Sequence, residues 1–341
     1  MKSCLVTGAA GFIGSHLVRE LLSTTDAKIV ALDDLSGGFR ENLPADSRVE
    51  FVKGSIVDHP LVDSLFAKHN FDHVYHLAAY AAEGLSHFIR RFNYTNNLIG
   101  SVNLINAAVN YNVKSFVFTS SIAVYGDGQV PMREEMVPQP EDPYGVAKYA
   151  VELDLAAAQR LHGLNYVVFR PHNVYGEYQN IGDRYRNVVG IFMNQILQGQ
   201  PLTVFGDGTQ QRAFSYVGDI TGPIASAAWT PAAHNKVFNI GADHPYTVNE
   251  LTTAVGKAMG VAKPQVRHLA ARDEVHIAYS DHSKSKQVFG APAATSLDDG
   301  LAKMATWVGE VGARTGQVFE GIEVAANMPE SWTNAGLFEA A

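Results

Sequence analysis

The chain has 341 residues, of which 46% are apolar and 18% charged, so a disordered, collagen-like or coiled-coil protein is excluded. Its net charge of −8 argues against nucleic acid as a partner, and no stretch approaches the roughly 20 apolar residues of a membrane span. Cys4 is the single cysteine, which rules out an internal disulfide, and no metal site is predicted. The length suits about two domains, and the start of the chain has no signal-peptide pattern, which predicts a soluble cytoplasmic protein.

The first half alternates short β-branched runs with helical patterns, which predicts βαβ units and a parallel sheet. Strands are expected at 3–7, 28–33, 49–53, 73–78, 115–119 and 166–170, and helices at 12–22, 61–69, 96–111 and from Tyr144 onward. The last of these helices has clear end signals. Asp142 is a good N-cap, Pro143 suits the first helical position, and Gly163 suits the C-terminal cap.

The second half is less regular. Helices are expected at 188–197, 220–229, 249–259 and 297–308, extended segments at 202–205 and 237–240, and a tight turn at 206–208. Leu297, Leu301, Met304 and Val308 should form one apolar face of the last helix. The final residues lack periodicity, which leaves a docked tail and a loose tail both open.

A glycine-rich turn directly follows the first predicted strand and opens the first predicted helix. Gly8, Gly11 and Gly14 allow close backbone approach there, and the amides of a helix N-terminus suit a pyrophosphate. Asp33 ends the second strand, where a carboxylate can accept from both ribose hydroxyls and repel a 2′-phosphate. This context predicts a dinucleotide site that prefers NAD to NADP.

A hydroxyl pair and a lysine form the candidate catalytic group. Tyr144 and Lys148 lie four residues apart on one helix face, and Ser121 follows a strand at the edge where open α/β sheets place ligands. We expect the ammonium and a cationic nicotinamide ring to lower the pKa of the Tyr144 phenol, so that it can act as a base.

Seven motifs follow one another in the order of a known family. They are VTGAAGFIGSHL (6–17), HLAA (76–79), NLIGSVNL (97–104), SSIAVYG (120–126), PYGVAK (143–148), RPHNVYG (170–176) and FGDGTQQRAFSYVGD (205–219). With these motifs the chain resembles the extended short-chain dehydrogenase/reductases, and within them the nucleotide-sugar 4-epimerases of the UDP-glucose 4-epimerase type.

The resemblance implies a Rossmann-type, doubly wound parallel sheet with a smaller C-terminal α/β substrate domain. The NAD-binding domain would span residues 1–172 with a returning segment near 213–241, the substrate domain 173–320 and a C-terminal tail 321–341. It also implies tightly bound, recycled NAD, a nucleotide-sugar substrate and a homodimer formed through the helices near 97–111 and 144–161.

The resemblance further assigns roles to individual residues. Ser121, Tyr144 and Lys148 would be catalytic, and Asn97 would hold the active-site helix. The residues implied to bind cofactor are Gly8, Gly11, Phe12, Ile13, Gly14, Asp33, Ser36, Ser55, Ile56, Leu77, Ala78, Ala79, Asn97, Tyr144, Lys148 and Pro171. Those implied to bind substrate are Ser121, Asn173, Asn187, Val188, Thr203, Phe205, Arg212, Arg272 and Glu274.

Arginines suit a diphosphate because guanidinium binds phosphate bidentately. Arg184, Arg186, Arg212 and Arg272 stand out in the second half, and for any one of them a solvated surface role is about as likely as ligand contact.

The implied activity is epimerisation at C4 of a nucleotide-diphosphate sugar through a transient 4-keto intermediate. Related dehydratases and decarboxylases carry acids just after the catalytic hydroxyl residue, where this chain has Ile122 and Ala123. Glu83 and Gly84 stand where several relatives have a basic residue, which weakens a uronic-acid substrate. UDP-glucuronate 4-epimerase, decarboxylase and dehydratase activities, and a non-catalytic NAD-sensing protein, stay open as alternatives.

Overall fold

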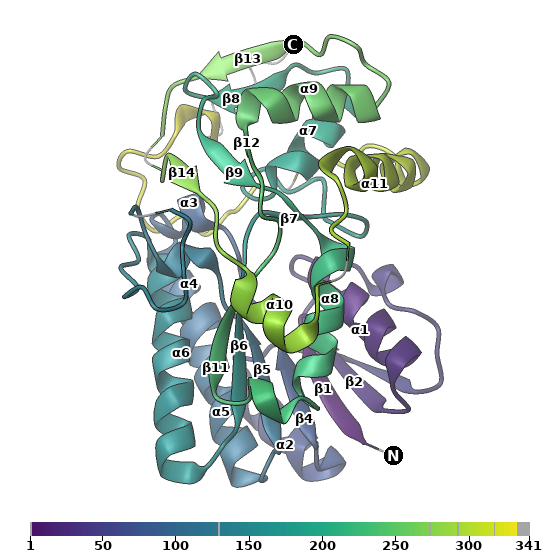
Figure 1. The fold of residues 1–341 in the computed structure, drawn as a ribbon, viewed down its shortest axis with the longest axis vertical. Helices are drawn as coiled ribbons and strands as arrows, with labels where there is room; N and C mark the ends of the chain where they lie inside the picture. Colours follow the sequence, from purple (N-terminus) through teal and green to yellow (C-terminus); the bar gives the residue numbers. More distant parts are fainter. Residues whose placement is uncertain (1, 129, 273, 292, 317, 333–341) are drawn as a thin grey trace.

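In the computed structural model, residues 2–128, 130–272, 274–291, 293–316 and 318–332 are described. Seven strands form a parallel sheet in the order β11-β6-β5-β4-β1-β2-β3 (Figure 1). They are β1 (Ser3–Thr7), β2 (Lys28–Asp33), β3 (Val49–Lys53), β4 (His73–His76), β5 (Ser115–Thr119), β6 (Tyr166–Pro171) and β11 (Lys236–Ile240). These strands are rich in Val, Ile and Phe because helices cover both faces of the sheet. The predicted Rossmann-type fold is confirmed.

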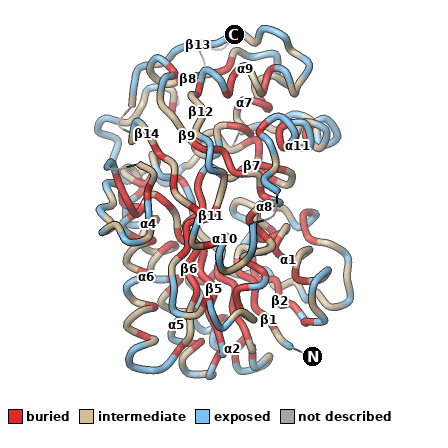
Figure 2. Tube along the Cα trace, in the orientation of Figure 1, coloured by how far each residue is buried: buried red, intermediate tan, exposed pale blue. Residues whose placement is uncertain are grey.

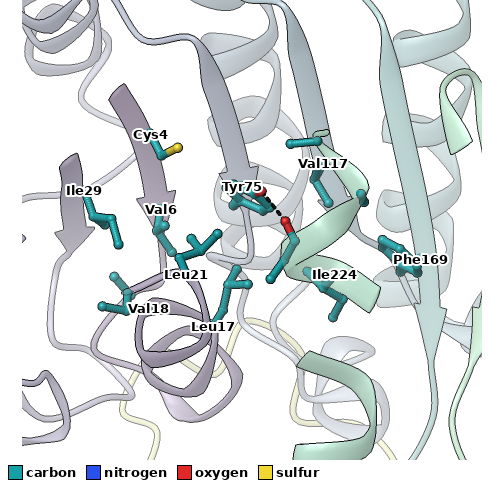
Figure 3. Close-up of a cluster of buried hydrophobic side chains, with 14 of the residues drawn as sticks. Cys4, Val6, Leu17, Val18, Leu21, Ile29, Tyr75, Val117, Phe169 and Ile224 are labelled. Atoms are coloured by element: carbon teal, nitrogen blue, oxygen red, sulfur yellow. Dashed lines mark hydrogen bonds between the residues drawn. The ribbon is translucent and has the colours of Figure 1, made fainter. Parts of the chain in front are cut away.

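Two hydrophobic clusters hold the helices to the sheet. One face carries α2 (His59–His69), α5 (Gly100–Asn110) and α6 (Pro143–His162), and the other carries α1 (Phe12–Thr24) and α8 (Val217–Ala227). Figure 3 shows Leu17 and Leu21 of α1 beside Val6 of β1, and the Tyr75 hydroxyl donating to the Ala225 carbonyl at 2.6 Å. Strands β1, β2, β4, β5 and β6 between these layers are almost entirely buried, whereas the edge strand β3 has no buried residue (Figure 2). We call this part of the molecule the sheet lobe.

A smaller lobe lies beyond the carboxyl ends of the strands. Its helices are α7 (Val188–Leu197), α9 (Val248–Ala258) and α11 (Leu297–Val311), and its short strands are β7 (Val174–Tyr175), β8 (Leu202–Phe205), β9 (Gln211–Ala213), β10 (Ser215–Tyr216), β12 (Pro245–Thr247), β13 (Val266–Leu269) and β14 (Ile277–Ala278). The predicted apolar face of α11 is confirmed, because all four of its residues are buried in this lobe's core.

The chain returns to the sheet lobe twice after entering the small lobe. α8 packs on α1, and β11 pairs with β6 at the edge of the sheet. Later, α10 (Ser283–Phe289) packs against β11. The small lobe is therefore tied to the sheet by several crossings.

Two predicted helices begin clearly earlier than expected. The helix expected at 96–111 begins earlier, with α4 (Arg90–Tyr94) and a π-helical stretch (Thr95–Ile99) before α5. The five-residue hydrogen-bonded turns of the π-helix interrupt the 3.6-residue period on which the prediction rested. The helix expected at 220–229 begins at Val217. The described part of the tail is docked, with Trp332 only 6% exposed, and residues 333–341 of the predicted tail lie outside the described residues.

None of the helices in the described ranges combines the length and apolarity needed to cross a membrane.

Candidate active site

A cavity of about 590 Å³ lies between the two lobes, at the carboxyl ends of β1, β2, β4, β5 and β6. The strand order reverses between β1 and β4, which is where open α/β sheets bind ligands. With one exception, every site residue implied by the sequence lines this cavity. They are Gly8, Gly11, Phe12, Ile13, Gly14, Asp33, Ser36, Ser55, Ile56, Leu77, Ala78, Ala79, Ser121, Tyr144, Lys148, Pro171, Asn173, Asn187, Val188, Thr203, Phe205, Arg212, Arg272 and Glu274.

The turn between β1 and α1 is built for close backbone approach. Gly8 has φ +67°, a left-handed conformation that favours glycine, and a Cβ there would lie 2.7 Å from the backbone N of Ala78. A Cβ on Gly14 would lie 2.0 Å from the Gly8 carbonyl oxygen. Gly11 and Phe12 line the cavity at the start of α1. The positive end of the helix dipole therefore faces the cavity, as an anion site requires.

Asp33 ties this turn to the next loop. Its carboxylate accepts from the backbone N–H groups of Ala10 at 2.9 Å and Leu35 at 2.8 Å. Burial raises the pKa of Asp33, although the hydrogen bonds from Leu35 and Ala10 oppose the shift. A carboxylate held in this way has lone pairs left for a ligand in the cavity.

The start of α6 positions the Tyr144–Lys148 pair. Asp142 accepts from the backbone N–H of Gly145 at 2.9 Å, which confirms the predicted N-cap, and the C-cap falls at Gly163 as predicted. Ser86 donates to Asp142 at 3.3 Å and accepts from the Tyr144 N–H at 3.2 Å. This first turn is thereby fixed to a second segment of the cavity wall.

Lys148 is buried beneath the cavity. Its Nζ donates to the Thr119 carbonyl at 2.9 Å and lies 5.7 Å from the centre of the Tyr144 ring. Burial lowers the pKa of Lys148 to about 7, although the nearby Glu152 carboxylate raises it. Glu152 itself pairs with the buried Arg170, whose Nε lies 3.0 Å from Oε1.

Tyr144 and Ser121 both line the cavity, and the Ser121 hydroxyl lies near enough to the Tyr144 phenol to influence its pKa. Burial raises the pKa of the Tyr144 phenol above its usual value; the Ser121 hydroxyl lowers it, and the charge of Glu83 raises it further. The expected lowering of the Tyr144 pKa by neighbouring groups does not outweigh the effect of burial. The described side chains by themselves therefore keep Tyr144 as a phenol.

Asn97 is the exception among the predicted residues: it is buried and does not line the cavity. Its amide bonds to the backbone of Tyr80, accepting from N–H at 2.7 Å and donating to C=O at 3.0 Å. The contact with α6 comes instead from Asn93, which donates to the Pro143 carbonyl at 2.8 Å. Asn97 donates to the Asn93 side chain at 2.7 Å, so its link to the active-site helix runs through Asn93. Its predicted contact with the cofactor is wrong, because its side chain is buried behind the cavity wall.

Three of the four prominent arginines line the cavity: Arg186, Arg212 and Arg272, but not Arg184. Arg212 donates to the carbonyl groups of Gln211, Val275 and His276. Arg272 pairs with Glu274 at 2.9 Å. Arg212 and Arg272 therefore meet at Glu274 at one end of the cavity, which suits a polyanionic ligand. Arg186 lies instead beside Gly37 in the loop after β2.

Two residues of this cavity were missed or undervalued by the sequence reasoning. Glu83 lines the cavity, where protein surrounds its carboxyl group. This burial raises the pKa of Glu83 to about 7. Gln179 is fully buried, and its amide N and O have no hydrogen-bond partner among the described residues. The sequence could have indicated Glu83, because it is a single acid that follows the HLAA motif by four residues. Nothing in the sequence marks Gln179.

Residues 4–241 match the model of the NAD dependent epimerase/dehydratase family. A UDP-glucose 4-epimerase of Mycolicibacterium smegmatis is 35% identical over 304 residues, covering 88% of this chain and 96% of that protein. A dTDP-glucose 4,6-dehydratase of an Actinoplanes species is 32% identical over 315 residues, covering 89% and 96%. The crystal structure of Thermotoga maritima UDP-glucose 4-epimerase with UDP-glucose superposes with a TM-score of 0.85 at 34% identity, covering 91% of this chain and 99% of that one.

Proposed function

This chain belongs to the NAD dependent epimerase/dehydratase family, and from that membership we propose that it is a nucleotide-sugar 4-epimerase. The substrate would be a UDP-glucose or UDP-galactose type of sugar, and the reaction would pass through a transient 4-keto sugar. One observation carries the proposal: Ser121, Tyr144, the glycine turn and three arginines all border the same cavity.

The cofactor of the family is NAD, and the cavity fits it. The glycine turn leaves no room for side chains beside the N-terminus of α1, and Asp33 borders the same space. We assign the remaining contacts to Ser36, Ser55, Ile56, Leu77, Ala78, Ala79, Pro171 and Lys148, all of which line the cavity. When bound, NAD supplies a reversible two-electron acceptor for the sugar and the positive charge of its oxidised nicotinamide ring.

Tyr144 would take the proton of the sugar 4-hydroxyl and later return it. Ser121, whose hydroxyl lies beside the Tyr144 phenol, would orient that proton transfer. Lys148 is fixed by the Thr119 carbonyl and would bind the cofactor ribose. Burial alone keeps Tyr144 in its neutral phenol form. A positive charge that the ligands bring into the cavity would lower its pKa and so favour the phenolate.

The arginine end of the cavity would hold the nucleotide diphosphate. Arg212 and Arg272 provide the positive charge, with Asn173, Asn187, Val188, Thr203, Phe205 and Glu274 completing the lining. Because the binding energy comes from this end, the 4-keto sugar would be free to turn and present either face of C4 to the cofactor.

The domain division and the assembly are further parts of the proposal. Residues 1–172 with 213–241 would bind cofactor, residues 173–320 substrate, and residues 321–341 would form the tail. A homodimer through α5 and α6 would cover Leu153 and Leu161 of α6, which are 54% and 78% exposed.

A 4,6-dehydratase is the second candidate, supported by the similarity to such enzymes and by Glu83, an acid inside the cavity. The residues that directly follow Ser121 argue against it. Ile122 and Ala123 border the cavity and cannot exchange protons with a sugar.

The test is to incubate the purified protein with a panel of UDP- and dTDP-hexoses, without added NAD, and to resolve the products. We expect the C4 epimer, because the cofactor is recycled. Release of water or carbon dioxide, or stoichiometric release of reduced cofactor, would overturn the proposal. Tyr144→Phe should abolish turnover and retain bound cofactor, whereas full activity of that variant would refute the assigned proton carrier.

A further inference from the structure

The end of the chain lies outside the segment that matches the family model, yet it packs behind the sugar end of the cavity. We call residues 313–316 and 318–332 the C-terminal strap. In Figure 1 this segment is the yellow trace that passes beside α3 (Glu83–Ser86) and α4. None of its described residues lines the cavity, so any effect on a ligand acts through the residues it touches.

The strap is anchored first on the small lobe. The backbone of Arg314 exchanges two hydrogen bonds with the side chain of Asn194 on α7, both at 2.9 Å. The guanidinium of Arg314 lies 3.9 Å from the centre of the Phe39 ring in the loop after β2. Arg314 therefore contacts both lobes beside the cofactor end of the cavity.

The second anchor lies on the sheet lobe. The carboxylate of Glu323 accepts from the backbone N–H groups of Arg91 at 2.7 Å and Phe92 at 2.9 Å, at the start of α4. The backbone N–H of Glu323 donates to the Phe88 carbonyl at 2.8 Å. These bonds fix the strap to the segment that carries the cavity wall.

Two aromatic side chains of the strap back residues that line the cavity. Phe319 lies 5.4 Å from the Tyr80 ring centre, and its backbone N–H donates to the Tyr185 hydroxyl at 3.2 Å. Trp332 lies 5.4 Å from the Tyr185 ring in an edge-to-face contact. Tyr80 and Tyr185 both line the cavity, and such aromatic contacts hold rings in defined orientations.

Trp332 also occupies the space beside Gly84. A Cβ on Gly84 would lie 3.1 Å from the Trp332 ring and 3.9 Å from the guanidinium of Arg272. The Trp332 ring therefore fills the space that a side chain at position 84 would otherwise occupy. The neighbouring Glu83 borders the cavity at the same corner.

We propose that the strap determines sugar specificity, with Phe319 and Trp332 as positioning residues that hold Tyr80, Tyr185 and the Glu83–Gly84 corner against the sugar. The inference rests on the proposed nucleotide-sugar function and deepens it by naming the sugar class. A wall that carries the Glu83 carboxyl beside a glycine suits a neutral hexose and disfavours a carboxylate-bearing one.

The experiment compares Trp332→Ala and Phe319→Ala with a matched control, Val324→Ala, whose side chain is 41% exposed on the same strap. For each variant, KM and kcat are measured with UDP-galactose, and the affinities for UDP and UDP-galactose are measured by calorimetry. We expect KM for the sugar nucleotide to rise about tenfold in both variants, kcat to change less, and UDP affinity to stay within about twofold. Trp332→Phe should restore most of the loss, because an aromatic ring still reaches Tyr185, and Val324→Ala should match the parent protein.

Unchanged KM in both alanine variants would overturn the proposal, and so would an equal loss of UDP affinity, which would indicate general disruption of the fold. Thermal unfolding of each variant identifies a variant that fails to fold, in which case Trp332→Phe and Phe319→Leu replace the alanines. If the parent protein turns over no sugar nucleotide, the proposed function fails, but the calorimetric comparison of UDP with UDP-galactose still tests the strap.

Discussion

The two ends of the cavity are built in different ways. The centre of the cofactor end is a backbone turn, in which Gly8, Gly11 and Gly14 come from one short stretch of chain and Gly8 packs against the backbone of Ala78. The sugar end is made of side chains from distant segments, with Glu83, Tyr185 and Arg272 backed by Trp332. A backbone site tolerates almost no added atom, whereas a side-chain site can change its ligand by single substitutions.

Gly14→Ala should break the cofactor end. The added Cβ would lie 2.0 Å from the Gly8 carbonyl oxygen and 2.9 Å from the Ala9 Cα, which are backbone atoms that cannot move aside cheaply. We expect NAD affinity to fall by at least about 100-fold and the free energy of unfolding to fall by about 1–3 kcal/mol. Fluorescence titration with NAD and urea denaturation measure the two effects.

Gly309→Ala is the matched control, because a Cβ there has nothing within 4 Å and Gly309 lies in α11. It should stabilise the protein by about 0.5–1 kcal/mol and leave NAD affinity unchanged. Normal NAD binding by Gly14→Ala would show that the turn is not the rigid element described above.

This contrast also explains what could be predicted from the sequence. The cofactor end could be predicted because its signals are local: a glycine turn between a strand and a helix, a strand-end acid, and a helix with both caps in place. The contact of Asn93 with Pro143 could not, since it joins residues that lie 50 positions apart in the sequence. Trp332 could not either, because its contact with Gly84 joins residues far apart in sequence.

The second prediction concerns Lys148, the buried cation of the cofactor end. Its pKa is lowered to about 7 by burial, against a usual value of 10.5 in the unfolded chain. Between these values the unfolded state binds more protons, so stability rises with pH there, and the cost of burying the ammonium is greatest at and below pH about 7. Lys148→Met removes that cost but leaves the Thr119 carbonyl without its donor. We expect turnover to be lost and the variant to be more stable by about 2 kcal/mol at pH 6–7, an advantage that shrinks toward pH 10.

Urea denaturation at several pH values measures this difference. Lys257→Met is the control, because Lys257 is exposed, pairs with Asp298 at 2.6 Å, and has a pKa that this partner raises. Its destabilisation should be small and stay constant from pH 6 to 9, because the exposed ion pair is screened by solvent. A difference for Lys148→Met that does not depend on pH would contradict the assigned pKa shift.

Arg212→Met should weaken the sugar-nucleotide end alone. The guanidinium is held by backbone carbonyl groups of two segments and lies 3.6 Å from Glu274. A charged hydrogen bond to phosphate contributes about 1.5–3 kcal/mol, so UDP should bind about 10- to 100-fold more weakly, with NAD affinity unchanged. Calorimetry with UDP measures this, and Arg267→Met on the exposed strand β13 is the control. Loss of NAD binding in Arg212→Met would mean that the two ends are not independent.

Asp33→Asn should give the smallest effect. It removes the charge of the carboxylate that stands at the end of β2, beside the cofactor end of the cavity. The carboxylate accepts from both Ala10 and Leu35, and an amide would turn its NH₂ group toward one of these donors. The loss of negative charge also removes repulsion of a 2′-phosphate. We expect NAD affinity to fall and the preference for NAD over NADP to decrease, each by about tenfold or less. Measuring the affinities for NAD and for NADP gives the preference of each variant.

Asp34→Asn is the companion variant. Asp34 also borders the cavity, but it is exposed and accepts only from the Ser36 N–H among the described contacts. If Asp34→Asn shifts the preference and Asp33→Asn does not, the discrimination lies with the exposed acid, and Asp33 serves only to brace the turn.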